Sequence, residues 1–168
     1  MSAALTLSAF LALAARCAPD MPADPDAARA RVERLAAYAR VESGFRPIAL
    51  NANGEAGSPQ RAASMDEAVA LASRLIAAGR SVDMGLMQVN SRHLRRLGLS
   101  VSEVMEPCRN IAVGAAILTD AERAAACIYN SGRHDCRRPS GTNGYPANIK
   151  AAVARVAEAG RAATPALA

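Results

Sequence analysis

Apolar residues recur at helical spacing along this chain, in runs bounded by residues that begin or end helices. In the segment 26–43 the apolar positions share one helix face: Val32, Leu35, Ala36 and Ala39. Alanine, the strongest helix former, is the commonest residue, and strand patterns are nearly absent. With 168 residues the chain is long enough to bury one core. The sequence therefore predicts a compact, mainly α single domain.

The remaining helices are predicted from their caps. Capping boxes open two of them, Ser64 with Glu67 and Ser100 with Glu103. Gly44 and Pro47 are expected to end the helix over 26–43. The others are expected over 91–98, 109–126 and 146–160. Residues 51–61 are expected to form a polar loop, and residues 83–90 have neither a helical nor a strand period.

The first 25 residues allow two interpretations. The apolar run has the length of an export signal but lacks a basic start, and Arg16 interrupts the expected cleavage site. We favour a helix of the domain that buries Phe10, Leu11 and Leu13. The main domain is then expected over 26–160, followed by a disordered tail over 161–168. No apolar stretch reaches the roughly 18 residues that span a bilayer, so we expect no stable membrane insertion.

The four cysteines are Cys17, Cys108, Cys127 and Cys136. An even number of cysteines in a small domain favours disulfides in an oxidising compartment, with three possible pairings. Free buried thiols are the alternative. A metal site would need closer cysteine pairs, and two lone histidines do not make one, so no metal is expected.

Glu42 is the most informative residue. The apolar stripe, extended by three residues from Ala39, reaches Glu42, so the helix turns this carboxylate toward the core just before it ends. Burial and the negative end of the helix dipole would raise the pKa of Glu42, as proton donation requires. In the alternative, the helix frays one turn earlier and Glu42 pairs with Arg46 in solvent.

Two further segments contain uncharged hydrogen-bonding side chains. One runs from Asp83 to Asn90 and includes Met87 and Gln88; the other runs from Ile128 to Gly132 and includes Tyr129 and Asn130. Amides such as those of Gln88 and Asn90 suit neutral, hydroxyl-rich ligands because each offers donors and an acceptor.

Together, Glu42-Ser43 at a helix end, then Gly-Leu-Met-Gln at 85–88, then Tyr-Asn-Ser-Gly at 129–132 resemble the soluble lytic transglycosylase domain of the lysozyme-like superfamily. The resemblance covers about residues 10–156 and is closest to the small transglycosylases encoded with type IV secretion and conjugation systems. It implies a lysozyme-like domain with a cleft between helical lobes and no cofactor.

By this resemblance, Glu42 would be the catalytic acid and base. It would cleave the bond between N-acetylmuramic acid (MurNAc) and N-acetylglucosamine (GlcNAc) in peptidoglycan and form 1,6-anhydro-MurNAc. The resemblance also implies substrate-binding roles for the following residues: Ser43, Met87, Gln88, Asn90, Tyr129 and Asn130. Ser43 would form a hydrogen bond near the acid, Gln88 would contact a sugar N-acetyl group, and Met87 would form an apolar wall of the cleft. Tyr129 would orient Glu42, and Asn130 would shape the cleft floor. Asp83 would have a turn or capping role.

The resemblance further suggests a Cys17–Cys108 bridge and a Cys127–Cys136 bridge. It implies peptidoglycan strands as substrate, a secretion or conjugation apparatus as partner, and the periplasm or cell envelope as location. A hydrolytic muramidase and a non-catalytic wall-binding scaffold are the alternatives.

The net charge of +5 and a set of arginines prompt a further alternative, a nucleic-acid binder: Arg92, Arg95, Arg96, Arg137 and Arg138. We interpret these arginines as a solvated face, open to anionic wall polymer or lipid, and expect no nucleic-acid partner.

Overall fold

The computed structural model describes residues 3–54 and 58–122. In chain order its helices are α1 (Leu7–Cys17), α2 (Pro25–Glu42), α3 (Met65–Ala77), α4 (Arg92–Leu97), α5 (Val101–Met105) and α6 (Pro107–Glu122). Its strands are β1 (Leu50–Ala52), β2 (Ser58–Gln60), β3 (Val82–Met84) and β4 (Val89–Asn90). The prediction of a mainly α chain is thus confirmed for the described residues.

Helices α3 and α5 begin at the N-cap serines that the sequence predicts. The Ser100–Glu103 capping box is complete, with each side chain bonded to the other residue's backbone N–H. At α3 the Ser64 hydroxyl accepts from the N–H of Glu67, but the Glu67 carboxylate accepts from Ala63 instead of Ser64. α6 begins two residues earlier than predicted because the Glu106 carboxylate accepts from the first free N–H groups of the helix.

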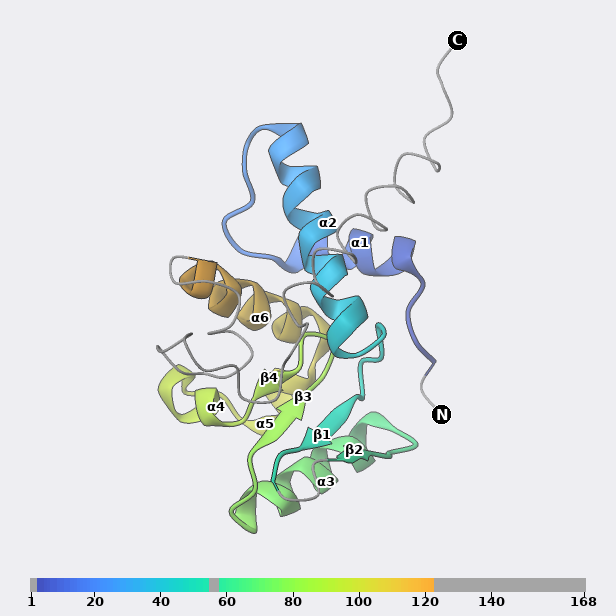
Figure 1. Cartoon of the computed structure of the whole chain (residues 1–168), viewed down its shortest axis with the longest axis vertical. Coiled ribbons are helices and arrows are strands. Elements are labelled where there is room, and N and C mark those ends of the chain that lie inside the picture. Colours follow the sequence, from blue (N-terminus) through green and yellow to red (C-terminus); the bar gives the residue numbers. More distant parts are fainter. Residues whose placement is uncertain (1–2, 55–57, 123–168) are drawn as a thin grey trace.

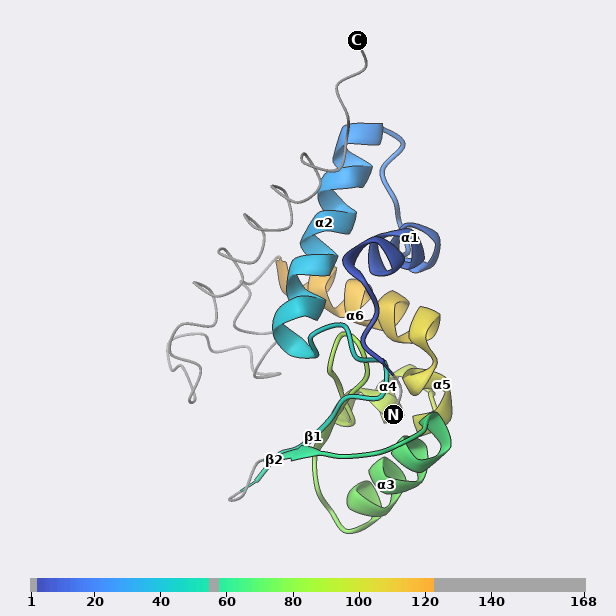
Figure 2. The same ribbon diagram turned by 90° about the vertical axis from the view of Figure 1, so that its right-hand side faces the viewer.

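The small sheet is the part of the fold that the sequence did not predict. It is antiparallel with strand order β2-β1-β3-β4, and residues 51–52 and 58–60 of the predicted polar loop over 51–61 belong to it. Each strand has only two or three residues, which is too short for an alternating pattern to be visible. α3 packs against β1 and β3 (Figures 1 and 2).

α1, α2 and α6 pack together on the other side of the structure, as Figure 1 shows. α1 buries Phe10 and Ala14 completely, while Leu11 and Leu13 are partly buried. A disulfide between Cys17 and Cys108 joins the end of α1 to the start of α6. The first helix is therefore packed in the core, with its apolar residues in contact with its neighbours.

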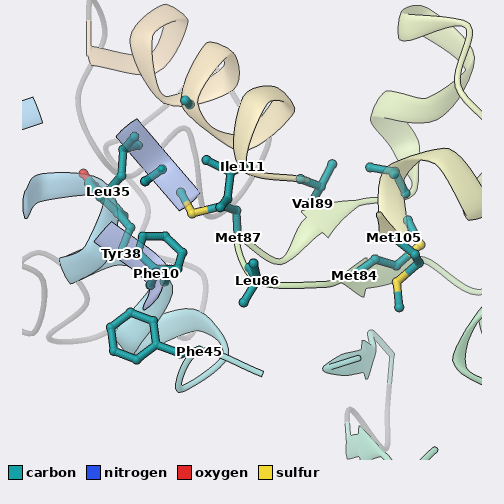
Figure 3. Packing of buried hydrophobic residues seen from close by; sticks show 14 of the residues in the cluster. Phe10, Leu35, Tyr38, Phe45, Met84, Leu86, Met87, Val89, Met105 and Ile111 are labelled. Atoms are coloured by element: carbon teal, nitrogen blue, oxygen red, sulfur yellow. The ribbon is translucent and has the colours of Figure 1, made fainter. Parts of the chain in front are cut away.

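The hydrophobic core extends from the helices to the sheet. Figure 3 shows Phe10 of α1 next to Phe45, with ring centroids 5.1 Å apart. Met87, between β3 and β4, lies beside Ile111 of α6 (Figure 3). The end of α2 and the β3–β4 turn consequently lie over one shared core. Within the described ranges no helix has both the length and the apolarity to cross a bilayer.

Candidate active site

Glu42 is the last residue of α2 and lies on its buried face. Tyr38 and Ala39, one turn earlier on the same face, are 5% and 0% exposed, whereas Glu42 is half-buried. Because α2 continues to Glu42, the alternative in which the helix frays one turn earlier is wrong. The Nε of Arg46 donates to the carbonyl oxygen of Ser43, at 3.1 Å.

The chain turns sharply after Glu42. Gly44 and Phe45 both adopt left-handed backbone conformations, with φ of 60° and 62°. A glycine adopts this conformation without strain, whereas for Phe45 it costs about 1–2 kcal/mol. Burial of the Phe45 ring against Phe10 offsets that cost. The packing of Phe45 thus fixes the end of α2. The helix ends just before Gly44, where the sequence predicted its end.

Ser43 joins the end of α2 to the β3–β4 turn. Its Oγ lies 2.8 Å from the carbonyl oxygen of Leu86 and 3.0 Å from that of Ala39. The residue is 2% exposed. Its hydroxyl is therefore used within the protein, and we propose a positioning role for Ser43, whereas its predicted substrate-binding role stays a prediction.

Gln88 lies at the end of this turn in a left-handed conformation, with φ of 47°. Its Nε2 donates to the carbonyl oxygens of Ala49 and Gly85, at 3.1 and 2.9 Å. Only the amide NH₂ can donate, so these two acceptors fix which way the amide points. Gln88 Oε1 then remains as an acceptor without a hydrogen bond to any residue that the structure describes.

Asn110 of α6 supports the turn from below. Its Oδ1 accepts from the N–H of Met87 at 2.7 Å, and its Nδ2 donates to the carbonyl oxygens of Met84 and Val104 at 2.9 and 2.8 Å. Asn110 is completely buried, and a Cβ at Gly85 would collide with its amide. Asn110 is a positioning residue that sequence reasoning missed, because a single buried amide leaves no periodic signal.

Met87 is also completely buried, and it packs so closely against α6 that a Cβ at Gly114 would overlap its side chain. This corrects the prediction that Met87 forms an apolar wall for substrate. Its side chain belongs to the core beneath the turn.

Asn90 is committed to a network at the sheet edge. Its Nδ2 donates to Ser81 Oγ at 2.9 Å and to Asp83 Oδ1 at 2.6 Å, while its Oδ1 accepts from the N–H of Arg92 at 3.0 Å. Asp83 Oδ2 accepts from Asn53 at 2.8 Å. Asn90 therefore holds β3, β4 and the start of α4 together, which differs from the predicted sugar contact. Asp83 binds strands together instead of capping a turn.

His93 of α4 is half-buried. Burial lowers the pKa of His93, the charge of Arg96 lowers it further, and Asp83 acts in the opposite direction. Tyr129, Asn130, Cys127 and Cys136 lie outside the residues that the structure describes.

Comparison with known proteins identifies the family. Residues 26–151 match the transglycosylase SLT domain. The chain belongs to this family. Glu42 and the turn at 85–88 both lie inside the matched range, as do Tyr129 and Asn130. Membership of the SLT family confirms the prediction of a lysozyme-like, mainly α domain, while the cleft between helical lobes stays a prediction.

The relatives of this SLT domain include proteins of type IV secretion. The type IV secretion system protein virB1 of Brucella abortus is 34% identical over 116 residues, which are 69% of this chain and 44% of the relative. Protein virB1 of Agrobacterium fabrum is 32% identical over 117 residues, covering 70% and 44%. The invasion protein IagB of Salmonella typhimurium is 39% identical over 72 residues, covering 34% and 45%. The chain thus spans less than half the length of these relatives. No solved structure matches it.

Proposed function

We propose that this SLT domain is a peptidoglycan lytic transglycosylase that cleaves the β-1,4 bond between MurNAc and GlcNAc and forms 1,6-anhydro-MurNAc. Membership of the transglycosylase family supports the reaction class. The observation that carries the proposal is the position of Glu42. It ends α2 half-buried, beside a residue whose hydroxyl bonds the Gly-Leu-Met-Gln turn.

Glu42 acts first as the general acid. Its protonated carboxyl group donates a proton to the glycosidic oxygen, the C1–O bond of MurNAc breaks, and GlcNAc leaves with a hydroxyl group. Positive charge develops at C1 and the ring oxygen as this bond breaks. Glu42 is left as a carboxylate.

The same carboxylate then acts as the base. It takes the proton of the C6 hydroxyl of MurNAc, the C6 oxygen forms a bond with C1, and the anhydro ring closes. Glu42 ends the cycle protonated, and no water is consumed. A nucleophile tethered within the sugar has a large effective molarity, so one carboxylate suffices where most glycosidases use two.

Gln88 would orient the sugar. Two backbone carbonyls hold its NH₂, so its Oε1 presents a fixed acceptor to the N–H of an acetamido group. The left-handed backbone of Gln88 costs about 1 kcal/mol, and such strain is characteristic of residues held in place for function. For Tyr129 we propose that it orients Glu42, and for Asn130 that it shapes the cleft floor.

The proposed setting is the periplasm, where the enzyme would open the wall for a type IV secretion or conjugation apparatus. The virB1 relatives support this partner. The Cys17–Cys108 disulfide supports an oxidising compartment.

Two matched substitutions test the proposed acid. Glu42→Gln keeps the size of the side chain but removes the proton, so we expect release of muropeptides from purified peptidoglycan to fall at least about 100-fold. Glu33→Gln removes the same charge from the same helix, nine residues earlier and on the opposite face, and should leave the rate unchanged. Cleavage that persists in Glu42→Gln would exclude Glu42 as the acid, and a parent protein that never cleaves would favour a scaffold.

A further inference from the structure

Three arginines form an exposed basic face on α4. Arg92, Arg95 and Arg96 are all exposed, and their spacing of three and four residues places them on one side of the helix. The opposite side holds Leu94, which is 9% exposed. We call Arg92, Arg95 and Arg96 the α4 arginine face.

This arrangement is unfavourable for the helix alone. Like charges at positions i and i+4 repel each other, and Arg92 places a positive charge at the positive end of the helix dipole. α4 has no acidic residue in its first turn, and the side chain of its N-cap Ser91 makes no capping bond. None of the three arginines forms an ion pair within residues 3–54 and 58–122. The charges therefore lack an anionic partner in the described structure.

The α4 arginine face lies next to the proposed sugar site. Arg92 follows Gln88 by four residues, so their Cα atoms are at most about 14 Å apart. The amide of Asn90 accepts from the N–H of Arg92 and fixes the helix to β4. Figure 1 shows α4 beside β4. A group attached to a sugar at Gln88 can therefore reach the arginines.

We propose that the α4 arginine face binds the free carboxylates of peptide stems on the glycan strand, so that the enzyme selects stem-bearing peptidoglycan over naked glycan. This inference rests on the proposed function. In stem-bearing strands the glycan backbone offers neutral hydroxyl and acetamido groups, because the lactyl carboxyl group of MurNAc is bound as an amide to the stem. The stems themselves bear free carboxylates. The guanidinium fork of arginine matches a carboxylate with two parallel hydrogen bonds.

A lipid surface is a weaker match for this face. A helix that binds a membrane surface presents a continuous apolar side as well as basic residues. α4 has only six residues. Among the described residues, Leu97 is the one large apolar side chain that is exposed, at 38%, so α4 has no continuous apolar side. A short arginine face beside the sugar site fits a substituent of the sugar better.

The test measures binding without cleavage. Full-length Glu42→Gln protein is titrated with two purified glycan oligosaccharides of equal length. One has intact tetrapeptide stems; from the other an amidase has removed the stems, and the lactyl carboxyl groups that this exposes have been capped as neutral amides. We expect the stem-bearing ligand to bind about 3- to 10-fold more tightly, because one or two exposed ion pairs contribute a free energy of that size. Added salt should reduce this preference, because it screens exposed charges. Adding Arg92→Gln and Arg96→Gln should abolish the preference. Adding Arg61→Gln and Arg74→Gln, which removes two exposed charges elsewhere, should preserve it.

Several results would overturn the inference. Equal affinity of Glu42→Gln for the two oligosaccharides would do so, as would equal loss of the preference in both double-arginine proteins. The same holds if the α4 substitutions leave the stem preference intact and reduce binding to phosphatidylglycerol vesicles or duplex DNA. Cleavage of stem-free strands by the parent protein tests the proposed function separately, because the binding comparison uses a protein that does not cleave.

Discussion

The hydroxyl of Ser43 lies 2.8 Å from the carbonyl oxygen of Leu86, and this buried hydrogen bond connects the end of α2 to the β3–β4 turn. Glu42 precedes one partner, and Gln88 follows the other by two residues. This bond therefore helps to hold the proposed acid and the proposed sugar contact in a fixed relative position.

Replacing Ser43 with alanine should reduce both stability and turnover. The change leaves the buried Leu86 carbonyl without its donor, which costs about 1–3 kcal/mol. We expect a lower kcat with a smaller change in KM, because the acid shifts relative to the bound sugar. Urea unfolding and kinetics on soluble glycan strands measure the two effects.

Ser73→Ala is the matched control for this substitution. The Ser73 hydroxyl donates to the carbonyl oxygen of Val69 within α3 and is exposed. Its loss should change stability by under about 0.5 kcal/mol and leave kcat unchanged. A folded Ser43→Ala protein with full kcat would contradict the positioning role.

Gly85→Ala should be more destabilising than Gly98→Ala. Both glycines have a positive φ, of 76° and 64°. Each substitution incurs backbone strain of about 1–2 kcal/mol. Only at Gly85 would the new Cβ also collide with the Asn110 amide, whereas at Gly98 nothing lies within 4 Å. We expect unfolding free energies to differ by at least about 1 kcal/mol, and equal losses would exclude the proposed support of the turn by Asn110.

The Cys17–Cys108 disulfide should stabilise the chain by about 2–4 kcal/mol, since it closes a long loop. Cys17→Ser, Cys108→Ser and the double substitution should therefore lower the free energy of unfolding by similar amounts. Denaturant titration of the three proteins measures this. Losses that add up in the double variant would indicate two independent cysteines.

The pKa of His93 should rise when Arg96 is replaced by glutamine, since the charge of Arg96 is the second cause, after burial, of its lowered value. Because the folded pKa lies below the unfolded one, His93 contributes stability that is present above its unfolded pKa of about 6.5 and is lost as pH falls toward its folded pKa. NMR titration of the imidazole in Arg96→Gln and in the control Arg74→Gln measures the shift. An unchanged pKa in Arg96→Gln would contradict the assigned cause.

The sequence predicted the elements that have a periodic apolar pattern or a local signal such as a capping residue. Helix α2 was predicted to within one residue at each end because its apolar stripe and Gly44 are visible in the chain. Glu42 was singled out because it continues that stripe. The sheet was missed because strands of two or three residues contain too little pattern.

The roles of individual polar residues could not be predicted from spacing. Asn90 and Gln88 both have amide side chains and lie two residues apart. In the structure both the nitrogen and the oxygen of the Asn90 amide are hydrogen-bonded within the protein, whereas the Gln88 oxygen has no partner among the described residues. The difference arises from partners distant in sequence, such as Ala49. Asn110, 23 residues from Met87, was missed for the same reason.

The mass of the cleavage product formed in ¹⁸O-labelled water tests the central claim most directly. If the C6 hydroxyl closes the ring, purified protein will release muropeptides that lack a reducing end, are lighter by one water than hydrolysis products and contain no ¹⁸O at C1. Products with a reducing MurNAc that contains ¹⁸O would contradict the account and identify a hydrolytic muramidase.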